Sequence, residues 1–459
     1  MTFPLGKPIA LMILAALASG LFIASRGSRD RADLVVWTFA DNHARTYRGD
    51  GTNTGPTLVS IFRHNTGQSV DVKLIGGQAT NLRLNSIFDN ADSITDVPDL
   101  VEIEISNVGQ FFRPPVSQVG FLPLNDRLAK SGWGNRIVAS RLTPWSKEGI
   151  IFGVPHDVHP VTLSYRRDLF EQAGVDLAAA RTWLEFQEKC LAFESYWRAH
   201  GFPRRRAIEL PSSSADYIIV MLLQRHLNLL DTDNTSHLTD PRVAATVEFY
   251  ARCVAGPRAF SGDASPGEGV WIRDIAEGEL CSCITPDWRA GLIKNSGYDL
   301  RGKLAMMPLP RFDPTDAPTA TWGGTMIGIP KQARDPDKSW KLLEHLYLSP
   351  DGMRARVQHS GLLPPVIEAW KDPIWHQPDP YFSDQKVGEL YIDLARQLPE
   401  RYVTPFTALA TQALTVVLNR AVTAVQSGDD ANLNRHLGGW LAEADAEVRK
   451  RIDFGRFDE

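Results

Sequence analysis

The stretch that decides the fold is GIIFGVPHDVHPVTLSYRRDLFEQAGVD, residues 149–176, followed by RTWLEFQEK, residues 181–189. The β-branched, apolar run Val158–Tyr165 predicts a strand. The segment RDLFEQA comes directly after it and predicts a short helix ended by Gly174. Thr182, with Glu185 three residues later, has the pattern of an N-cap that opens a second helix. The stretch therefore predicts a strand followed at once by two helices.

The composition is that of a globular chain with no bias toward a charged partner. The 459 residues are 43% hydrophobic and carry a formal net charge of -5. This length predicts two to three globular units with an ample core. The weakly acidic balance gives no reason to expect a nucleic acid partner. The 12 tryptophans are many, and their faces suit stacking on sugar rings, although most tryptophans pack in cores.

The N-terminus carries a candidate export segment. Lys7 precedes the apolar run Ile9–Ala24, which has the pattern of a secretory signal, and Ala16–Ala18 offers a cleavage site of the small-x-small kind. Three arginines follow the run and outnumber the lysine before it, which favours an uncleaved anchor. We therefore expect residues 1–33 to be a signal peptide or an N-terminal membrane anchor, with residues 9–24 as the tether in the second case.

The cysteines predict no metal site. Cys190, Cys253, Cys281 and Cys283 have no metal-ligand spacing with histidine. We expect them to be small buried hydrophobes, and their disulfide state stays open because an exported chain can form such bonds. No cofactor is expected.

Downstream of residue 33, strand and helix patterns alternate. The pattern predicts strands at 34–38, 70–75 and 97–105 and helices at 57–64 and 82–90. This order favours a mostly parallel α/β sheet, whose ligand sites lie beyond the carboxyl ends of its strands. Those ends are residues 39–42, 76–78 and 106–107. Further helices are expected at 183–199, 217–230, 241–254 and within 406–452, with a helix, turn and strand across 275–288.

Four landmarks stand in one order along the chain. They are PDLV at 98–101, the GVP to GVD stretch at 153–176, EGE to PDW at 277–288, and WGG to PPV at 322–366. Together they resemble the extracellular solute-binding proteins of sugar ABC importers, the maltose-binding-protein-like class, over nearly the whole chain from Leu34. The resemblance implies the two-lobed α/β periplasmic-binding-protein fold, in which each lobe is a mostly parallel sheet flanked by helices and a multi-crossing hinge joins them.

The resemblance also implies domain boundaries. Residues 34–160 and the return segment 320–366 would form lobe 1. Residues 161–319 would begin lobe 2, and the C-terminal helices in 367–459 would belong mainly to it. The first crossing is the strand predicted at 158–165. Residues 320–331, ATWGGTMIGIPK, resemble the second crossing of the family.

A sugar site needs aromatic faces for the rings and planar polar groups for the hydroxyls. Phe39, Asp41 and Asn42 end the first predicted strand, where the family contacts its ligand; the alternative is that Asp41 and Asn42 turn the chain or cap a helix. Ser106 and Asn107 end the third strand. Maltodextrin-binding relatives carry a carboxylate at the position of Ser106, so the resemblance disfavours that ligand.

Three polar residues lie at the first crossing. His156, Asp157 and His159 invite a metal interpretation. Residues three apart in a strand face opposite sides, so the two histidines would converge only if the strand bends, and we expect no metal there. In the family a cleft-facing polar residue occupies the position of His159. A hydrogen bond to solute is therefore expected, with a histidine satisfied inside the hinge as the alternative. Ser213 precedes a predicted helix, where it would face the cleft or cap the helix.

Two tryptophans are the main aromatic candidates. Trp288 follows a predicted strand, where the family places its stacking aromatic, and plain packing is the alternative. Trp322 precedes Gly323 and Gly324, which permit close backbone approach to a ligand or a twist of the hinge. Arg289 is expected to be solvated at the surface, with a pair to a carboxylate or phosphate as the alternative.

The sequence carries no G-x-S-x-G, P-loop, G-x-G-x-x-G or H-E-x-x-H motif, so we expect a binding protein and no enzyme. The resemblance implies that a monomer captures a sugar or oligosaccharide and delivers it to ABC permease subunits with a cytoplasmic ATPase. The protein would be secreted or anchored at the periplasmic or extracellular face of a bacterial inner membrane. The alternatives are a membrane-tethered sensory binding protein and an exported glycan-active enzyme, for which Asp41 and Asp157 would be the carboxylates.

Overall fold

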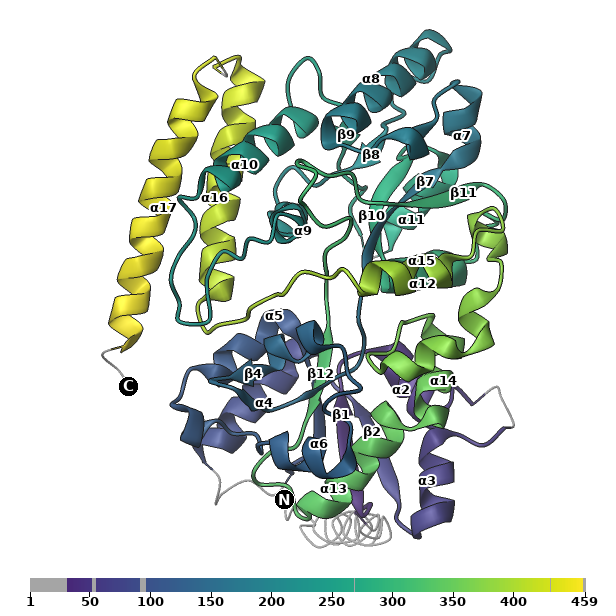
Figure 1. Ribbon diagram of the computed structural model, residues 1–459, viewed down its shortest axis with the longest axis vertical. Helices are drawn as coiled ribbons and strands as arrows, with labels where there is room; N and C mark the ends of the chain where they lie inside the picture. Colours follow the sequence, from purple (N-terminus) through teal and green to yellow (C-terminus); the bar gives the residue numbers. More distant parts are fainter. Residues whose placement is uncertain (1–30, 52–54, 91–95, 268, 430, 457–459) are drawn as a thin grey trace, which may run out of the picture.

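The computed structural model describes residues 31–51, 55–90, 96–267, 269–429 and 431–456, and in these ranges the chain forms two lobes joined by extended crossings (Figure 1). The predicted signal or anchor, up to residue 30, lies outside the described residues. The two-lobed α/β fold expected from the sequence is confirmed.

Lobe 1 is built on a five-stranded sheet in the order β2-β1-β3-β12-β6. Its strands are β1 (Leu34–Thr38), β2 (Val70–Leu74), β3 (Leu100–Glu104), β12 (Thr325–Gly328) and β6 (Val154–Pro155). The strand β1 runs parallel to β2 and β3, whereas β12 runs antiparallel to β3 and β6. The carboxyl ends of β1, β2 and β3 therefore meet at one edge, as parallel neighbours must.

Helices cover both faces of this sheet. They include α2 (Asp41–Arg48), α3 (Leu58–Thr66), α4 (Gly77–Asp89), α5 (Ile105–Val108), α6 (Asn125–Ser131), α13 (Pro336–Leu343) and α14 (Pro350–Ser360). Thr57 and Ser60 form a capping box that starts α3. One core contains Tyr47, Phe62 and Trp340, and a second core on the opposite face contains Trp37 and Phe121.

Lobe 2 has a smaller sheet, in the order β10-β7-β11. Its strands are β7 (Val161–Arg166), β10 (Ser282–Pro286) and β11 (Leu304–Pro308). Both outer strands run antiparallel to β7, so the expectation of a mostly parallel sheet is wrong for this lobe. The reason lies in the path of the chain: β7 leads away from the crossing, and β10 returns to it, with Pro286 opposite Val161.

Helices surround this second sheet. They are α7 (Arg167–Gln172), α8 (Trp183–Ala199), α9 (Asp216–Gln224), α10 (Pro241–Val254), α11 (Val270–Glu277), α12 (Asp287–Asn295), α15 (Val387–Ala395), α16 (Thr407–Ser427) and α17 (Leu433–Arg456). The capping box of Thr182 and Glu185 starts α8, as the sequence predicts. All four cysteines are buried with free thiols.

The C-terminal pair α16 and α17 packs beside α10 at one side of lobe 2 (Figure 1). Within the described residues, α16 is the one helix long and apolar enough to cross a membrane by length and composition. Leu414, Leu418 and Ala421 of α16 are buried in the large core of lobe 2. We therefore interpret α16 as a core helix. The domain boundaries taken from the resemblance stay a prediction.

The first two crossings lie side by side. The Val161 N–H donates to the carbonyl of Ala320 at 3.0 Å, and Pro160 forms an isolated bridge with Thr321. The strand expected at 158–165 begins only at Val161, because His159 adopts a left-handed backbone conformation with φ of 54°. The bend falls where the chain leaves lobe 1, and it turns side chains on both sides of the crossing toward each other.

Candidate functional site

A buried row of charged groups runs along the first crossing. The Arg141 guanidinium lies 3.3 Å from Oδ1 of Asp157, and Nε2 of His159 lies 3.1 Å from Oδ2 of the same carboxylate. The other ring nitrogen of His159, Nδ1, lies 2.5 Å from Oδ1 of Asp287. With a carboxylate at each nitrogen, the ring donates from both and carries a positive charge. The row thus alternates in sign from Arg141 in lobe 1 to Asp287 in lobe 2.

Burial and charge act in opposite directions on His159. Burial disfavours the imidazolium, but Asp157 and Asp287 outweigh it and raise the pKa of His159 to about 9. Asp287 is held in turn by the main-chain N–H groups of Trp288 and Leu363, each at 2.8 Å from a carboxylate oxygen. Asp287 therefore joins the crossing, the start of α12 and the segment after α14.

The expectation that His156 and His159 face opposite sides is wrong. His156 Nδ1 lies 3.3 Å from Asp157 Oδ2, the oxygen that His159 also approaches. The positive φ of His159 removes the strand alternation on which the expectation rested. All three residues are at most 5% exposed. They form a connected interior network, the histidine arrangement that the sequence left as the alternative.

Two tryptophans meet at the carboxyl end of β10. The Trp288 indole N–H donates to the carbonyl of Trp322 at 3.1 Å, and the two ring centroids lie 5.4 Å apart in an edge-to-face arrangement. The ring of Tyr217 meets Trp322 edge-on at 4.8 Å. Both tryptophans are half-buried, so each retains some exposed surface. This group offers the flat apolar surface that a sugar ring needs.

The glycines after Trp322 allow these groups to meet. Gly323 has φ of 86°, and a Cβ there would lie 3.2 Å from the Trp288 indole nitrogen and 3.4 Å from Cδ2 of His159. Gly324 has φ of 143°, and a Cβ there would lie 2.4 Å from the Arg141 guanidinium. A side chain at either position would separate the tryptophans from the charged row or displace Arg141.

Arg289 is not at the surface, so the expectation of a solvated arginine is wrong. It is 3% exposed, lies 2.7 Å from the Glu209 carboxylate and sits 3.7 Å from the centroid of the Trp271 ring. It also donates to the hydroxyl of Tyr217. Because α12 begins at Asp287, its first turn directs Arg289 inward to support Tyr217, which in turn contacts Trp322.

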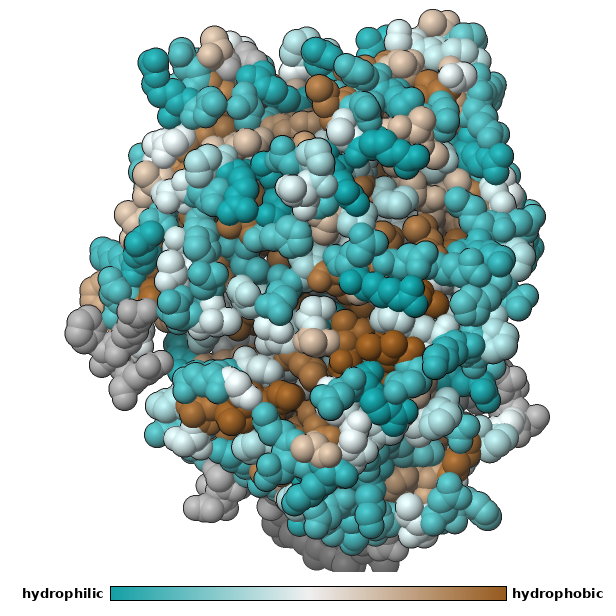
Figure 2. All heavy atoms as spheres, in the orientation of Figure 1, coloured by the Kyte–Doolittle hydropathy of each residue, from teal (hydrophilic) through white to brown (hydrophobic). Residues whose placement is uncertain are grey.

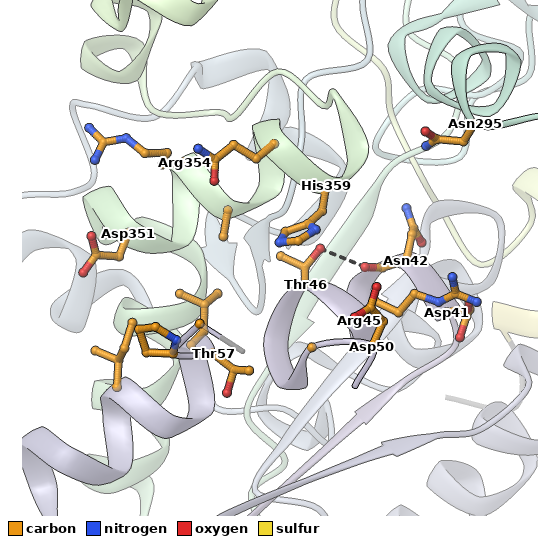
Figure 3. Close-up of a pocket in the computed structure, with 17 residues that line it drawn as sticks. Asp41, Asn42, Arg45, Thr46, Asp50, Thr57, Asn295, Asp351, Arg354 and His359 are labelled. Carbon is orange, nitrogen blue, oxygen red and sulfur yellow. Dashed lines mark hydrogen bonds and ion pairs between the residues drawn. The ribbon is translucent and has the colours of Figure 1, made fainter. Parts of the chain in front are cut away.

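The first turn of α2 lies at the rim of a pocket of about 680 Å³ (Figure 3). Asp41 is exposed and forms an ion pair with Arg45 at 2.7 Å. Asn42 is exposed too, and its amide lies 3.5 Å from the hydroxyl of Ser360 at the end of α14. A Cβ on Gly291 of α12 would lie 2.6 Å from the Ser360 carbonyl, so Ser360 sits between the two lobes. Asn295 of α12 also lines this pocket.

The edge of β3 comes close to the second crossing. The Ile105 N–H donates to the Gly324 carbonyl at 2.9 Å. Ser106 is exposed and Asn107 half-buried, and both side chains turn back to the carboxylate of Glu104. A carboxylate is thus present at this edge two residues before Ser106, although Ser106 itself carries none. The sequence prediction passed over Glu104 because it falls inside a strand pattern.

The structure brings most of the predicted residues together and leaves Ser213 apart. Contacts connect Asn42, Ser106, Asn107, His156, Asp157, His159, Trp288, Trp322, Gly323 and Gly324 through their neighbours, with Asp41 on the same turn as Asn42. In the described part of the chain, Ser213 lies in an exposed turn before α9 and bonds to none of them. Phe39 is half-buried and is connected through His43, whose ring centroid lies 6.2 Å from that of Phe39 and 3.9 Å from that of His156.

The sequence prediction missed two supporting residues and placed a third, Arg289, at the surface. Arg141 and Asp287 complete the charged row, and Arg289 supports the tryptophan group. Asp287 had a visible signal, because it directly precedes Trp288 in the PDW landmark. Arg141 had none, since it lies 16 residues from its partner Asp157 in an irregular region.

The chain forms two lobes joined by adjacent crossings, and aromatic and polar groups lie where the lobes meet. This arrangement is that of a two-lobed ligand-binding protein. A family model for the bacterial extracellular solute-binding protein matches residues 64–382. The chain belongs to this family. Membership places it in the periplasm or outside the cell, and its relatives and fold are those of solute-binding proteins and not of enzymes.

Individual relatives are distant but cover most of the chain. The arabinooligosaccharide-binding protein of Halalkalibacterium halodurans is 21% identical over 398 residues, which cover 84% of this chain and 84% of the relative. The structure of the sugar-binding protein MalE from Xanthomonas citri aligns with a TM-score of 0.70 and 21% identity, covering 92% of this chain and 99% of that one. UgpB from Mycobacterium tuberculosis, in complex with glycerophosphocholine, aligns with a TM-score of 0.68 and 18% identity over 91% and 99% of the chains.

Proposed function

We propose that this chain captures a sugar or oligosaccharide between its lobes and presents it to the permease of an ABC importer, without chemistry on the solute. The observation that carries the proposal is the edge-to-face pair of Trp288 and Trp322 beside Gly323. A half-buried aromatic corner next to the hinge suits a ring-shaped solute with an apolar face. The named arabinooligosaccharide-binding relative supports the same class of solute.

The solute would bridge the lobes. Trp288 and Trp322 would stack on sugar rings. Asp41 and Asn42, in the first turn of α2, would form hydrogen bonds with the sugar hydroxyls. Ser106 and Asn107, held by Glu104, would add hydrogen bonds from the edge of β3. Closure would then be driven by the extra contacts that the solute makes with both lobes in the closed state. Ser213 would take part only if closure brings it to the solute.

Partners and tethering follow from the same proposal. The closed form would dock on permease subunits driven by a cytoplasmic ATPase, and residues 9–24 would hold the chain near them if the segment stays uncleaved. A gene deletion that abolishes uptake of the solute would support the importer role. Normal uptake with a lost transcriptional response to the solute would instead indicate the sensory role.

The experiment that tests binding is calorimetry with the purified full-length chain. The panel would hold arabino-, galacto- and malto-oligosaccharides, their monosaccharides and glycerophosphocholine. The proposal expects a saccharide to bind, and it is wrong if only glycerophosphocholine binds or if any saccharide is cleaved. Replacing Trp288 by Ala is then expected to weaken saccharide binding at least about tenfold, or about 1.4 kcal/mol.

A matched control separates stacking from general loss of packing. Trp440 on α17 is also half-buried, and its ring stacks on His436 at 5.5 Å, away from the crossings. Trp440→Ala is expected to retain the affinity of the unchanged chain. Equal loss of affinity in both variants, or a Trp288→Ala chain that melts much earlier yet binds normally, would show that Trp288 is a packing residue.

A further inference from the structure

A second cluster of histidine and carboxylate groups lies inside lobe 1. His43 belongs to α2, Glu102 to β3, and His156 to the crossing directly after β6. Each offers one nitrogen or oxygen atom, and these atoms all lie within 4.8 Å of one another. The exposed fractions of the three residues are 4%, 0% and 1%, so water does not reach the cluster from the surface. Among the described residues, no other group of three or more such side chains converges in this way.

One nitrogen of His156 is left without a hydrogen-bond partner. Its Nδ1 lies 3.3 Å from Asp157 Oδ2, whereas Nε2 is buried and unpaired. A histidine that donates one N–H to a carboxylate keeps the lone pair of its other nitrogen free, and this is the arrangement that metal-ligating histidines adopt. An unpaired buried nitrogen is unfavourable on its own, which a bound cation would relieve.

The carboxylate of Glu102 is held in one orientation by four side chains. The hydroxyls of Tyr47 and Tyr347 donate to Oε1. His43 Nδ1 lies 2.9 Å from Oε2, the same atom to which the Thr38 hydroxyl donates. The two phenols thus fix the carboxylate from one side and present Oε2 toward the histidines. Such outer hydrogen bonds are the usual support of a ligating carboxylate.

The two imidazole rings are stacked face to face. The ring centroids of His43 and His156 lie 3.9 Å apart with an interplanar angle of 25°. A hydrogen bond between His43 and Glu102, with the His43 ring stacked on His156, would account for this contact without a metal. That arrangement leaves Nε2 of His156 unpaired, which a shared cation would satisfy. Because the lone pair of an imidazole lies in its ring plane, one of the two stacked rings must turn when both bind the same ion.

We propose that His43, Glu102 and His156 form a structural site for a divalent first-row transition metal ion, with Zn²⁺ as the best match. Two imidazoles and one carboxylate are a donor set that Zn²⁺ accepts, and the buried location favours a permanently held ion. The sequence analysis considered a metal only at His156 with His159 and expected none there. The ion would tie α2, whose first turn carries Asp41 and Asn42, to the crossing that carries His159.

The test begins with the unmodified full-length chain, freed of any histidine tag. The protein would be stripped with a chelator, desalted and titrated with Co²⁺ as a spectroscopic probe, then with Zn²⁺. The proposal expects about one ion per chain, visible Co²⁺ absorption bands that Zn²⁺ removes, and a melting temperature several degrees higher with metal than without. X-ray absorption of the Zn²⁺ form would show imidazole nitrogens and a carboxylate oxygen at about 2.0–2.2 Å.

Substitutions decide which residues bind the ion. His156→Gln and Glu102→Gln are each expected to abolish stoichiometric binding, whereas His345→Gln is expected to keep it. His345 is a matched control because it is a half-buried histidine of the same lobe whose Nε2 lies 2.8 Å from the Leu58 carbonyl. The proposal is overturned if the unmodified chain takes up no metal, if its absorption spectrum lacks imidazole ligands, or if both cluster variants fold and still bind one ion. Should both variants fail to fold, the stoichiometry and spectrum of the unmodified chain decide alone.

Discussion

The Nδ1 atom of His159 lies 2.5 Å from Oδ1 of Asp287, and this contact joins the first crossing to the first turn of α12. Both residues are buried, and the next residue after Asp287 is Trp288. The hinge and the aromatic corner therefore share one hydrogen-bonded network. A change in the charge of His159 reaches both at once.

This contact predicts a loss of stability at alkaline pH. Burial opposes the charged ring of His159, but Asp157 and Asp287 raise its pKa to about 9, above the unfolded value near 6.5. Stabilisation by the imidazolium is then complete below about pH 6.5 and disappears as the pH rises through about 9. We expect the free energy of unfolding to fall by up to about 3 kcal/mol over that window. Urea unfolding at a series of pH values measures it.

The His159→Gln variant provides the control for that series. It is expected to be less stable at neutral pH and to lose little further stability on the way to alkaline pH. A variant whose pH profile matches that of the unchanged chain would assign the loss to other groups.

The arrangement of elements followed from the sequence to a large extent, because local patterns determined it. Thr182 and Glu185 specified the start of α8, and the apolar run of β1 and the helix Pro241–Val254 appeared as expected. The strand directions of lobe 2 did not follow, since pairing depends on where distant segments return. The two-lobed arrangement was predicted from the family resemblance and not from local patterns.

The site was predictable where a residue sits at the end of a strand. Trp288 and Gly323 were found in this way, and the structure brings them within contact. Arg141 and Glu102 were not predicted, because their partners are distant in sequence and the residues next to them form no distinctive pattern. Whether Trp288 and the other predicted residues bind solute stays a prediction.

A buried ion pair beneath the aromatic corner predicts a large loss of stability on Arg289→Ala. The substitution leaves the carboxylate of Glu209, a residue that is 6% exposed, without its cation at 2.7 Å. We expect a cost of about 3–5 kcal/mol, because an uncompensated buried charge is strongly unfavourable. Thermal or urea unfolding measures the cost. Arg451→Ala removes an exposed pair with Glu447 at 3.0 Å and is expected to cost less than about 1 kcal/mol. Equal costs in the two variants would contradict the buried pairing.

The thiols are expected to be unreactive in the folded protein. All four cysteines are buried, and burial raises the pKa of Cys281 to about 12 and that of Cys283 to about 11. Few thiolates then exist at about pH 8, and reagent has little access to them. A colorimetric thiol assay should detect almost none in the native chain and 4 after denaturation without reductant. Fewer than that number in denaturant would reveal a disulfide.

A methyl group at Gly323 is expected to weaken both folding and binding, whereas the same change at Gly297 weakens folding alone. Gly323→Ala places an L residue at φ of 86° and its Cβ 3.2 Å from the Trp288 indole nitrogen. Gly297→Ala is the matched control, because Gly297 has φ of 83° and no atom within 4 Å of the added Cβ. Both variants should lose about 1–2 kcal/mol of stability from the left-handed backbone. Only Gly323→Ala must also move Trp288, so it alone should lose saccharide affinity, by about tenfold or 1.4 kcal/mol. Calorimetry with the saccharide that binds the unchanged chain, alongside urea unfolding of both variants, measures the two effects. Unaltered affinity in Gly323→Ala would mean that the position of Trp288 does not matter to the ligand.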